Sequence, residues 1–398
     1  MGAPANQPAF ALESSMLHKA LVRSNTLQQL PSPLVFGLML VNGLVTALAW
    51  GAFHDTAGAA AAGAVVFGGG SLNWLALWLL PRAGRSFGPD KPPALALMLA
   101  FTALALILAI FAAPLWLLIA LITIITAVAI YATWIEPFRL SVTREKIGFS
   151  DGQPAAGSPV RNTAAIRLLH IGDIHVEHIT ERERRLNRLI QQLQPDIIVF
   201  TGDFVNLSYN RDERTHGEIR QIISGWEAPL GVYCVSGTPT VEPLALVTAL
   251  VRGISQITLL ANRWAELDTP AGKLHLAGMV TTHDIDEDRR ALASLAGNFP
   301  IDGFKILLSH SPDLAPEAAA LGFDLYLCGH THGGQIRLPF LGAMLSASYY
   351  GRRFVMGRYQ VGAMALHTTR GVGMEGLGAP RARFLCPPEI VLWELGGG

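Results

Sequence analysis

The sequence CGHTHGGQI at residues 328–336 places two histidines, His330 and His332, one residue apart among glycines. It follows an apolar stretch, DLYLC, of the kind that forms a buried strand. Because successive side chains of an extended segment point to opposite faces, residues two apart share a face. The two imidazoles are therefore expected to turn together into one site.

Two acidic runs upstream complete the pattern of a metal site. The run GDIH contains Asp173 and His175, again two residues apart, and a second run, GD, ends at Asp203. A centre with two cations needs a carboxylate that bridges them, and further imidazoles and carboxylates that leave room for water. Asp203 is the candidate bridging ligand. Together, the runs predict a two-metal site for phosphoester hydrolysis.

Each polar run comes after a strand-like segment. These segments are residues 167–171, 196–200, 232–235, 305–308 and 324–328. In open α/β sheets, binding sites gather beyond the carboxyl ends of the strands. His310 follows one of these segments and adds another imidazole. The pattern predicts an α/β fold with the polar runs at one end of a sheet.

These motifs resemble those of the calcineurin-like metallophosphoesterase family, and within it a bacterial membrane-associated branch whose signature is GHTHGGQ. The resemblance covers roughly residues 165–395, including a late Arg370-Gly371 run and the terminal run CPPEI. It implies a two-sheet sandwich flanked by helices, which hydrolyses phosphoesters with two divalent ions, Mn, Fe or Zn. It also implies that the first metal is held by Asp173, His175, Asp203 and His332, and the second by Asp203, His310 and His330.

One element of the family is missing. Where the family has Gly-Asn-His and then an acid, this chain has Gly237, Thr238, Pro239 and Thr240. In the family, the asparagine ligates the second metal and the histidine faces the scissile phosphate. A threonine hydroxyl is a weaker donor than an amide oxygen, so the second metal is expected to bind loosely. Loss of a positioned acid typically costs about 10²- to 10⁴-fold in rate.

Two functional hypotheses follow from these residues. The first is slow hydrolysis by metal-activated water, best with good leaving groups, with Asp203 as the central ligand. In this hypothesis Arg370 contacts a phosphate oxygen in bidentate fashion, although a solvated loop arginine is the alternative for this residue. The second hypothesis is a catalytically weak or inactive pseudoenzyme that acts as a membrane-bound binding module.

Other titratable residues near the motifs have simpler interpretations. His367 lies with Arg370 in the polar run HTTRGVG, which the resemblance places near the site. The acidic cluster at residues 283–288 is expected to form a solvated turn and the start of a helix, not a third metal site. Thr180, followed by Glu181 and Glu183, is expected to cap another helix.

The first third of the chain is strongly apolar. Four of its stretches are each about as long as the 17 to 25 residues that cross a bilayer core as a helix, namely 34–53, 58–80, 94–112 and 115–135. Helices satisfy the backbone polar groups in lipid, and the small residues of the second stretch allow close helix packing. The sequence therefore predicts a bundle of about four transmembrane helices.

Lysine and arginine residues flank these stretches on one side. They lie before the first stretch, between the second and third, and after the fourth, whereas the other two connections have none. By the positive-inside rule, both termini are cytoplasmic. We expect a multi-pass protein of a bacterial inner membrane whose catalytic domain lies in the cytosol.

The expected domain division follows from these segments. It comprises a cytoplasmic tail at 1–33, transmembrane helices at 34–135, a linker at 136–163 and a metallophosphoesterase domain at 164–398. Within the linker, residues 137–149 are expected to form a strand that adds to the catalytic sheet, and residues 150–163 a loop or tether. Three cysteines without a CxxC motif fit a reducing compartment.

Charge and membrane attachment limit the partners. The sequence has 30 basic and 30 acidic residues and no basic tract, so nucleic acid is not an expected partner. The lipid bilayer is the expected partner. A phosphoesterase anchored in it suits a lipid phosphate or diphosphate, because such a substrate shares the membrane plane. The natural substrate and the oligomeric state do not follow from the sequence.

Overall fold

The structure is a computed structural model that describes residues 23–148, 165–298 and 300–396. The predicted tether at 150–163 and most of the predicted N-terminal tail lie outside these residues. The chain divides into two compact units, which we call the sheet unit and the helical unit. The sheet unit includes Phe138–Glu375 and Arg383–Gly398, and the helical unit includes Leu12–Pro137 and Gly376–Ala382.

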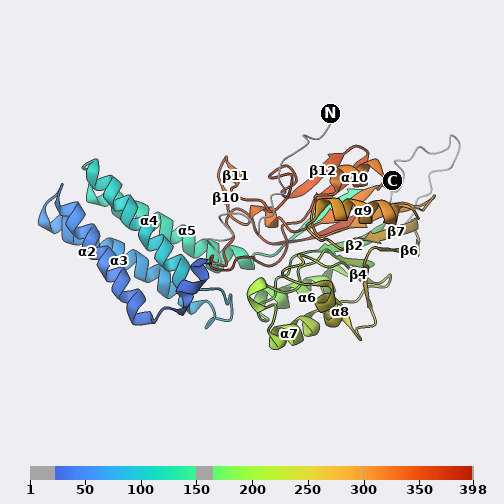
Figure 1. The fold of residues 1–398 in the computed structure, drawn as a ribbon, viewed down its shortest axis with the longest axis horizontal. Helices are drawn as coiled ribbons and strands as arrows, with labels where there is room; N and C mark the ends of the chain where they lie inside the picture. Colours follow the sequence, from blue (N-terminus) through green and yellow to red (C-terminus); the bar gives the residue numbers. More distant parts are fainter. Residues whose placement is uncertain (1–22, 149–164, 299, 397–398) are drawn as a thin grey trace. The chain divides into compact units, whose positions relative to one another are not determined.

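Four long apolar helices form the helical unit (Figure 1). They are α2 (Ser32–Gly51), α3 (Thr56–Leu79), α4 (Lys91–Ile110) and α5 (Leu115–Ile130). A short 3-10 turn, η2 (Thr26–Gln29), precedes them, and the turns η3 (Tyr131–Ile135) and η4 (Glu136–Phe138) continue α5. Helices α2, α3 and α4 are each long and apolar enough to cross a membrane, and so is α5 taken together with η3 and η4. The predicted bundle is confirmed, and its last helix extends beyond the predicted end at residue 135.

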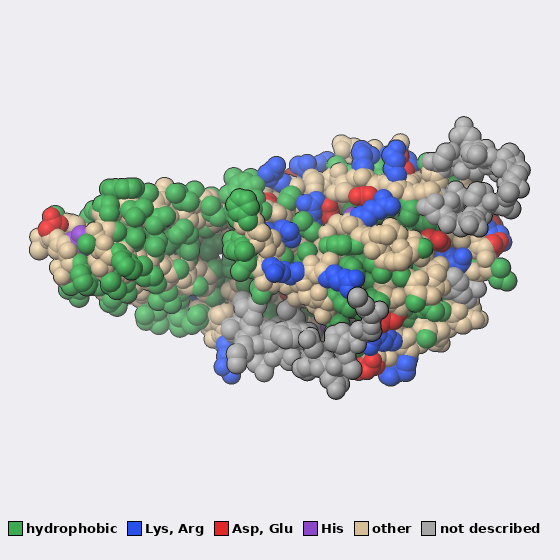
Figure 2. All heavy atoms as spheres, turned by 90° about the horizontal axis from the view of Figure 1, so that it is seen from above, with side chains coloured by type: hydrophobic (Ala, Val, Ile, Leu, Met, Phe, Trp, Pro, Cys, Tyr) green, Lys and Arg blue, Asp and Glu red, His purple; other side chains and the backbone are tan. Residues whose placement is uncertain are grey.

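Small residues let these helices approach closely. A Cβ atom added to Gly63 of α3 would lie 2.5 Å from the carbonyl oxygen of Gly43 of α2. A Cβ atom added to Gly70 would lie 2.2 Å from the sulfur of Met98 of α4. Close packing of this kind drives helix association in lipid, where the hydrophobic effect between helices is absent. The outward helix surface in Figure 2 is largely hydrophobic and carries few charges, as lipid contact requires.

Two six-stranded sheets form the sheet unit, with strand orders β1-β14-β2-β3-β4-β5 and β12-β13-β9-β8-β7-β6. The first sheet contains β1 (Ser141–Ile147), β14 (Glu389–Leu395), β2 (Ile166–Ile171), β3 (Ile197–Phe200), β4 (Val232–Cys234) and β5 (Ile257–Leu259). The second contains β12 (Gly357–Val361), β13 (Met364–Thr368), β9 (Leu325–Cys328), β8 (Phe304–Leu308), β7 (Gly272–Gly278) and β6 (Arg263–Thr269). Strands β2 to β5 run parallel, as do β7 to β9.

The two sheets share a buried core. It includes Leu168 of β2, Val199 of β3, Ile306 of β8, Leu327 of β9 and Trp393 of β14. All four residues of β3 are buried. Parallel strands that are covered on both faces have continuous apolar sequences, which explains the run IIVF. The predicted two-sheet sandwich is confirmed.

Helices cover the outer faces of the sandwich (Figure 1). They are α6 (Glu181–Leu193), α7 (Glu213–Ile223) and α8 (Leu244–Val251) on the first sheet, and α9 (Ile285–Ala296) and α10 (Ala315–Ala320) on the second. Helix α6 begins with a capping box formed by Thr180 and Glu183. Helix α9 begins at Asp284, whose side chain accepts backbone hydrogen bonds from Asp286 and Glu287. The acidic cluster is therefore a helix start, as predicted.

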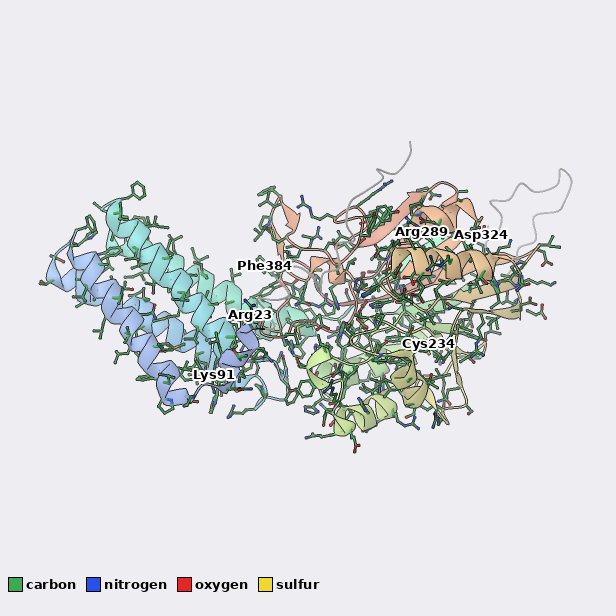
Figure 3. The ribbon with its side chains drawn as sticks, viewed as in Figure 1. Arg23, Lys91, Cys234, Arg289, Asp324 and Phe384 are labelled. Carbon is green, nitrogen blue, oxygen red and sulfur yellow. The ribbon has the colours of Figure 1, made fainter. Side chains whose placement is uncertain are left out.

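The strand after the last membrane helix joins the catalytic sheet. It is β1, which pairs in parallel with β14 at the edge of the first sheet. Only Arg139 and Leu140 separate η4 from β1. The three cysteines are free and buried, including Cys234 at the end of β4 (Figure 3).

Candidate metal centre

The predicted metal ligands lie in loops at the carboxyl ends of strands. Asp173 and His175 follow β2, Asp203 follows β3, and His330 and His332 follow β9. All five have positive φ values, between 38° and 70°. Such backbone is uncommon for residues other than glycine and clusters at functional sites. The prediction that extended backbone pairs the two histidines on one face is therefore wrong, because the intervening chain turns.

One group of possible ligands contains Asp173, His175 and His332, all buried, with donor atoms within 4.8 Å of one another. Nε2 of His175 lies 3.0 Å from Nε2 of His332. Oδ1 of Asp173 lies 4.0 Å from Nε2 of His332. Asp173 and His175, which are close in sequence, thus form a ligand group with His332, which follows a strand of the other sheet.

A second group contains Asp203, His310 and His330, again with donor atoms within 4.8 Å. Nε2 of His310 lies 3.1 Å from Oδ2 of Asp203 and 3.1 Å from Nδ1 of His330. The same Oδ2 atom lies 3.5 Å from Nε2 of His175 in the first group. The other oxygen, Oδ1, accepts a hydrogen bond from the backbone of Thr238. One carboxylate oxygen of Asp203 therefore faces both groups.

Hydrogen bonds do not satisfy all of these donor atoms. The facing nitrogens of His175 and His332 need a proton or a cation between their lone pairs. The buried Oδ2 of Asp173 has no hydrogen-bond partner among the described residues. Buried polar atoms without partners cost free energy, and mixed nitrogen and oxygen donors suit divalent transition metals. The residues present therefore fit two divalent cations.

The carboxylates of the site attract positive charge, either as protons on His175 and His310 or as metal ions that replace those protons. Burial by itself would lower the pKa of His310, but the carboxylate of Asp203 raises it to about 10. Burial likewise opposes ionisation of Asp203, but His310 holds the pKa of Asp203 well below its usual range. In His330 and His332, burial holds the pKa well below the usual value. These two rings are therefore neutral, which is the form that ligates metals.

Comparison with known proteins agrees with this geometry. The family described as calcineurin-like phosphoesterase matches residues 166–241, a segment that contains Asp173, His175 and Asp203. Over this segment the chain matches the calcineurin-like phosphoesterase family. The matched segment covers β2, β3 and β4, and thus the loops that carry three of the six proposed ligands.

Bacterial proteins match this metallophosphoesterase over longer parts of its sequence. "Uncharacterized metallophosphoesterase YkuE" of Bacillus subtilis (strain 168) is 29% identical over 282 residues, covering 67% of this chain and 88% of that protein. "Phosphodiesterase YaeI" of Escherichia coli (strain K12) is 26% identical over 271 residues, covering 67% and 92%. "UDP-2,3-diacylglucosamine pyrophosphatase LpxG" of Chlamydia trachomatis serovar D is 24% identical over 314 residues, covering 66% and 91%. These matches support a phosphoester-hydrolysing enzyme.

Thr238 lies inside the second ligand group of the metallophosphoesterase. Its hydroxyl oxygen lies 3.1 Å from Oδ2 of Asp203 and 3.1 Å from Nε2 of His310. It is 3.5 Å from Nδ1 of His330. The threonine therefore occupies a position from which a side-chain oxygen reaches the second group, while Pro239, the next residue, supplies no acid.

Two carboxylates that the sequence did not single out support the ligands. Oε2 of Glu375 lies 3.0 Å from Nδ1 of His175, and it helps raise the pKa of His175 to about 9 against the effect of burial. Gln335 holds Glu375 through two hydrogen bonds to its backbone. Glu242 accepts hydrogen bonds from the backbone nitrogens of Asp203, Phe204 and Gly237. Neither residue belongs to a motif, so only the folded chain reveals its position.

Three other residues differ from their sequence interpretation. Nη2 of Arg370 pairs with Glu389 at 2.5 Å, so Arg370 is not a solvated loop arginine, and its contact with phosphate stays a prediction. His367, expected near the site, is buried on β13, with its ring 5.6 Å from that of Trp393 in the core. His283 is expected in a solvated turn, but its ring lies 4.9 Å from the ring of His330.

Proposed function

We propose that this chain is a membrane-anchored phosphoesterase that hydrolyses a phosphoester or diphosphate with two divalent cations. The observation that carries the proposal is the position of Asp203, whose Oδ2 atom lies 3.5 Å from His175 and 3.1 Å from His310. A carboxylate between two sets of imidazoles is the arrangement that two-metal hydrolysis needs. Asp203 is accordingly the bridging ligand in the proposal.

Each set of residues has a defined task. Asp173, His175 and His332 would hold one cation with Asp203, and His310 and His330 would hold the other with Asp203. When bound, such cations polarise a phosphate and lower the pKa of a water molecule. The backbone hydrogen bond from Thr238 to Oδ1 of Asp203 keeps Oδ2 directed at both groups. Glu375 orients His175 through its Nδ1 atom.

The Thr238-Pro239 pair limits the rate in this proposal. Without an imidazole at position 239, the chain itself offers no proton donor there for the leaving group. Hydrolysis should therefore depend strongly on the leaving group, with aryl esters much faster than alkyl esters. The same pair motivates the second candidate, a binding module that takes up metal and phosphate but turns over no substrate.

The substrate proposed is a lipid phosphate or lipid diphosphate on the cytoplasmic side of a bacterial inner membrane. The four apolar helices supply the membrane anchor. The positions of lysine and arginine around them favour cytoplasmic termini. One relative is named as a pyrophosphatase for UDP-2,3-diacylglucosamine, which supports an acylated diphosphate as the class of substrate.

The decisive experiment measures metal content and turnover of the full-length protein in detergent. With Mn²⁺ present, we expect hydrolysis of an aryl phosphodiester, and we expect Asp203→Asn to abolish it. Asp268→Asn, at an exposed position of β6, is the matched control and should retain activity. Bound metal without turnover above the Asp203→Asn background would establish the binding module instead. Absence of both bound metal and turnover would refute both candidates.

A further inference from the structure

A short hairpin of the sheet unit exposes a concentration of hydrophobic side chains. Its strands are β10 (Arg337–Leu338) and β11 (Gly342–Ala343). Among the described residues of the sheet unit, ten large hydrophobic side chains are exposed, and six of them lie at positions 336–345. Phe340 is fully exposed and Leu341 exposes 62% of its surface. Apolar groups gathered in this way mark a surface that meets a partner.

The backbone holds the tip of this hairpin outward. Phe340 has a φ value of 65°, a conformation that bulky residues rarely adopt. The guanidinium group of Arg352 donates hydrogen bonds to the carbonyl oxygens of Leu341 and Ala343, at 3.1 Å and 3.3 Å. Since the adjacent strand is braced in this way, the exposure of Phe340 is a property of the folded turn. Strained backbone persists where the surrounding structure demands it, and it clusters at functional sites.

The charged residues of the sequence that contains the hairpin are all basic. Between Asp324 and Glu375 the sequence has five arginines and no acidic residue. Two of them, Arg358 and Arg370, pair with glutamates of the sheet unit. The other three, Arg337, Arg352 and Arg353, lie on or shortly after the hairpin. Guanidinium groups bind phosphate oxygens strongly, so this surface is complementary to anionic lipid headgroups.

Both ends of the hairpin adjoin the metal centre. Only three residues separate His332 from Ile336. At the other end, the carbonyl oxygen of Ala347 lies 3.2 Å from Nε2 of His330. The backbone nitrogen of Arg337 donates to the carbonyl oxygen of Phe384, which ties the start of the hairpin to the rest of the sheet unit. A partner that binds the hairpin therefore lies close to the proposed ligands.

We propose that the β10–β11 hairpin inserts its apolar tip into the headgroup region of the bilayer, as a membrane contact separate from helices α2 to α5. The bilayer is the proposed partner, because an apolar hairpin tip with arginines at its foot is the pattern of interfacial anchors. The chain also carries its own membrane-spanning helices, and only Arg139 and Leu140 separate the last of them from β1. Insertion does not require catalysis, so it can be tested whether or not the proposed function holds.

The test measures the depth of one labelled position in the full-length protein reconstituted into vesicles. All three native cysteines are buried, so Phe340→Cys provides an accessible thiol for an environment-sensitive fluorophore. Ile301→Cys is the matched control, because Ile301 is also a fully exposed hydrophobic residue of the sheet unit but lies outside the hairpin. The vesicles contain brominated phosphatidylcholine, alone or mixed with anionic phosphatidylglycerol.

We expect the label at position 340 to shift its emission to the blue and to lose intensity in brominated lipid, more so with phosphatidylglycerol. The label at position 301 should show neither change. Leu341→Asp, added to the Phe340→Cys protein, should reduce the quenching, because a charge at the tip opposes insertion. The inactive Asp203→Asn background should leave the quenching unchanged.

Two results would overturn the proposal. One is equal emission of the two labels in brominated lipid. The other is self-quenching of the label at position 340 that rises with protein concentration in detergent, with no effect of brominated lipid. This second result would assign the hairpin to contact with another copy of the chain.

Discussion

His330 and His332 are separated by one residue and contribute to different ligand groups. Nδ1 of His330 lies 3.1 Å from Nε2 of His310, whereas Nε2 of His332 lies 3.0 Å from Nε2 of His175. Their left-handed backbone, with φ values of 70° and 51°, directs the two rings apart. The loop after β9, in the second sheet, thus contributes one histidine to each ligand group. Asp203, which follows β3 of the first sheet, faces both groups.

Because His330 and His332 belong to different ligand groups, substituting one or the other should remove a different metal ion. His330→Ala should empty the group of Asp203 and His310, and His332→Ala the group of Asp173 and His175, because each removes one of few ligands. Metal analysis of the purified proteins should find about one cation per chain in each variant and about two in the parent. His216→Ala, on α7, is the control and should keep both. Loss of both cations from either variant would contradict independent groups.

Restoring the missing pair should raise activity. The variant Thr238→Asn with Pro239→His places an amide oxygen and an imidazole where the hydroxyl of Thr238 already contacts Asp203 and His310. We expect kcat to rise by about 10²- to 10⁴-fold for alkyl esters, and by less for aryl esters, because a positioned acid matters most for poor leaving groups. Thr240→Asn, at a nearby exposed position, should have little effect. An unchanged kcat would show that a different residue limits the reaction.

The stability of the metal-free protein should fall as pH rises above about 6.5. The pKa of His175, about 9, and that of His310, about 10, exceed the value of 6.5 for a free imidazole. Their contribution to stability is therefore fully present below about pH 6.5 and is lost as pH rises through about 9 to 10. Burial raises the pKa of Asp173 to about 6, which acts in the same direction between about pH 4 and 6.

Metal binding should have the opposite pH dependence, because cations compete with protons for His175 and His310. Thermal unfolding with chelator and with Mn²⁺, at several pH values, measures both trends. The difference between the two unfolding midpoints should widen from about pH 6 to about pH 9. A difference that stays constant over this range would show that these two imidazoles do not exchange protons for metal.

Glu375 should affect metal affinity without being a ligand in its own right. Its carboxylate contacts the Nδ1 atom of His175, the ring nitrogen that faces away from the other donor atoms. Glu375→Gln should weaken the affinity of the first group for metal by about 10- to 100-fold, because such partners fix the ring and raise its basicity. A competition titration with a metal-binding dye measures this change. Glu227→Gln, at an exposed position, should match the parent protein.

Substitutions at Arg370 and Glu389 should separate a structural role from a catalytic one. Glu389 is nearly fully buried, and its carboxylate accepts from both the side chain and the backbone of Arg370. Arg370→Ala should therefore lower the free energy of unfolding by about 1–3 kcal/mol, since it removes a charged hydrogen-bond partner of a buried carboxylate that then keeps neutral donors, among them the Thr143 hydroxyl and the backbone nitrogen of residue 370. If Arg370 also contacts phosphate, Arg370→Ala should raise KM, and Glu389→Gln should not. Equal KM values in the two variants would leave Arg370 a structural residue.

The ligand residues were predictable because motifs and strand ends are local properties. Runs such as IIVF and LYLC have the apolar composition of buried parallel strands, and the polar runs after them must lie at the ends of those strands. The four apolar helices were predictable for the same reason, since length and hydropathy are enough to identify a span.

The supporting residues were not predictable, because they depend on contacts between distant segments. Glu375 lies far along the chain from His175, and Glu242 accepts hydrogen bonds across the turn that carries Asp203. His367 illustrates the opposite error: the resemblance placed its polar run near the site, but pairing of β13 with β9 and β12 makes it a buried strand residue. Local composition does not report which strand a segment will join.

The sequence by itself determined which ligand residues this metallophosphoesterase has, which strands they follow, and where its apolar helices lie. Only the tertiary structure decided how the ligands divide, with His330 and His332 in different groups and Oδ2 of Asp203 facing both. It also decided that Arg370 pairs with Glu389 and that Phe340 is exposed. The physical reason is that residue chemistry and periodicity are properties of short stretches of sequence. The direction of each side chain depends instead on backbone turns and on packing between segments far apart in the chain.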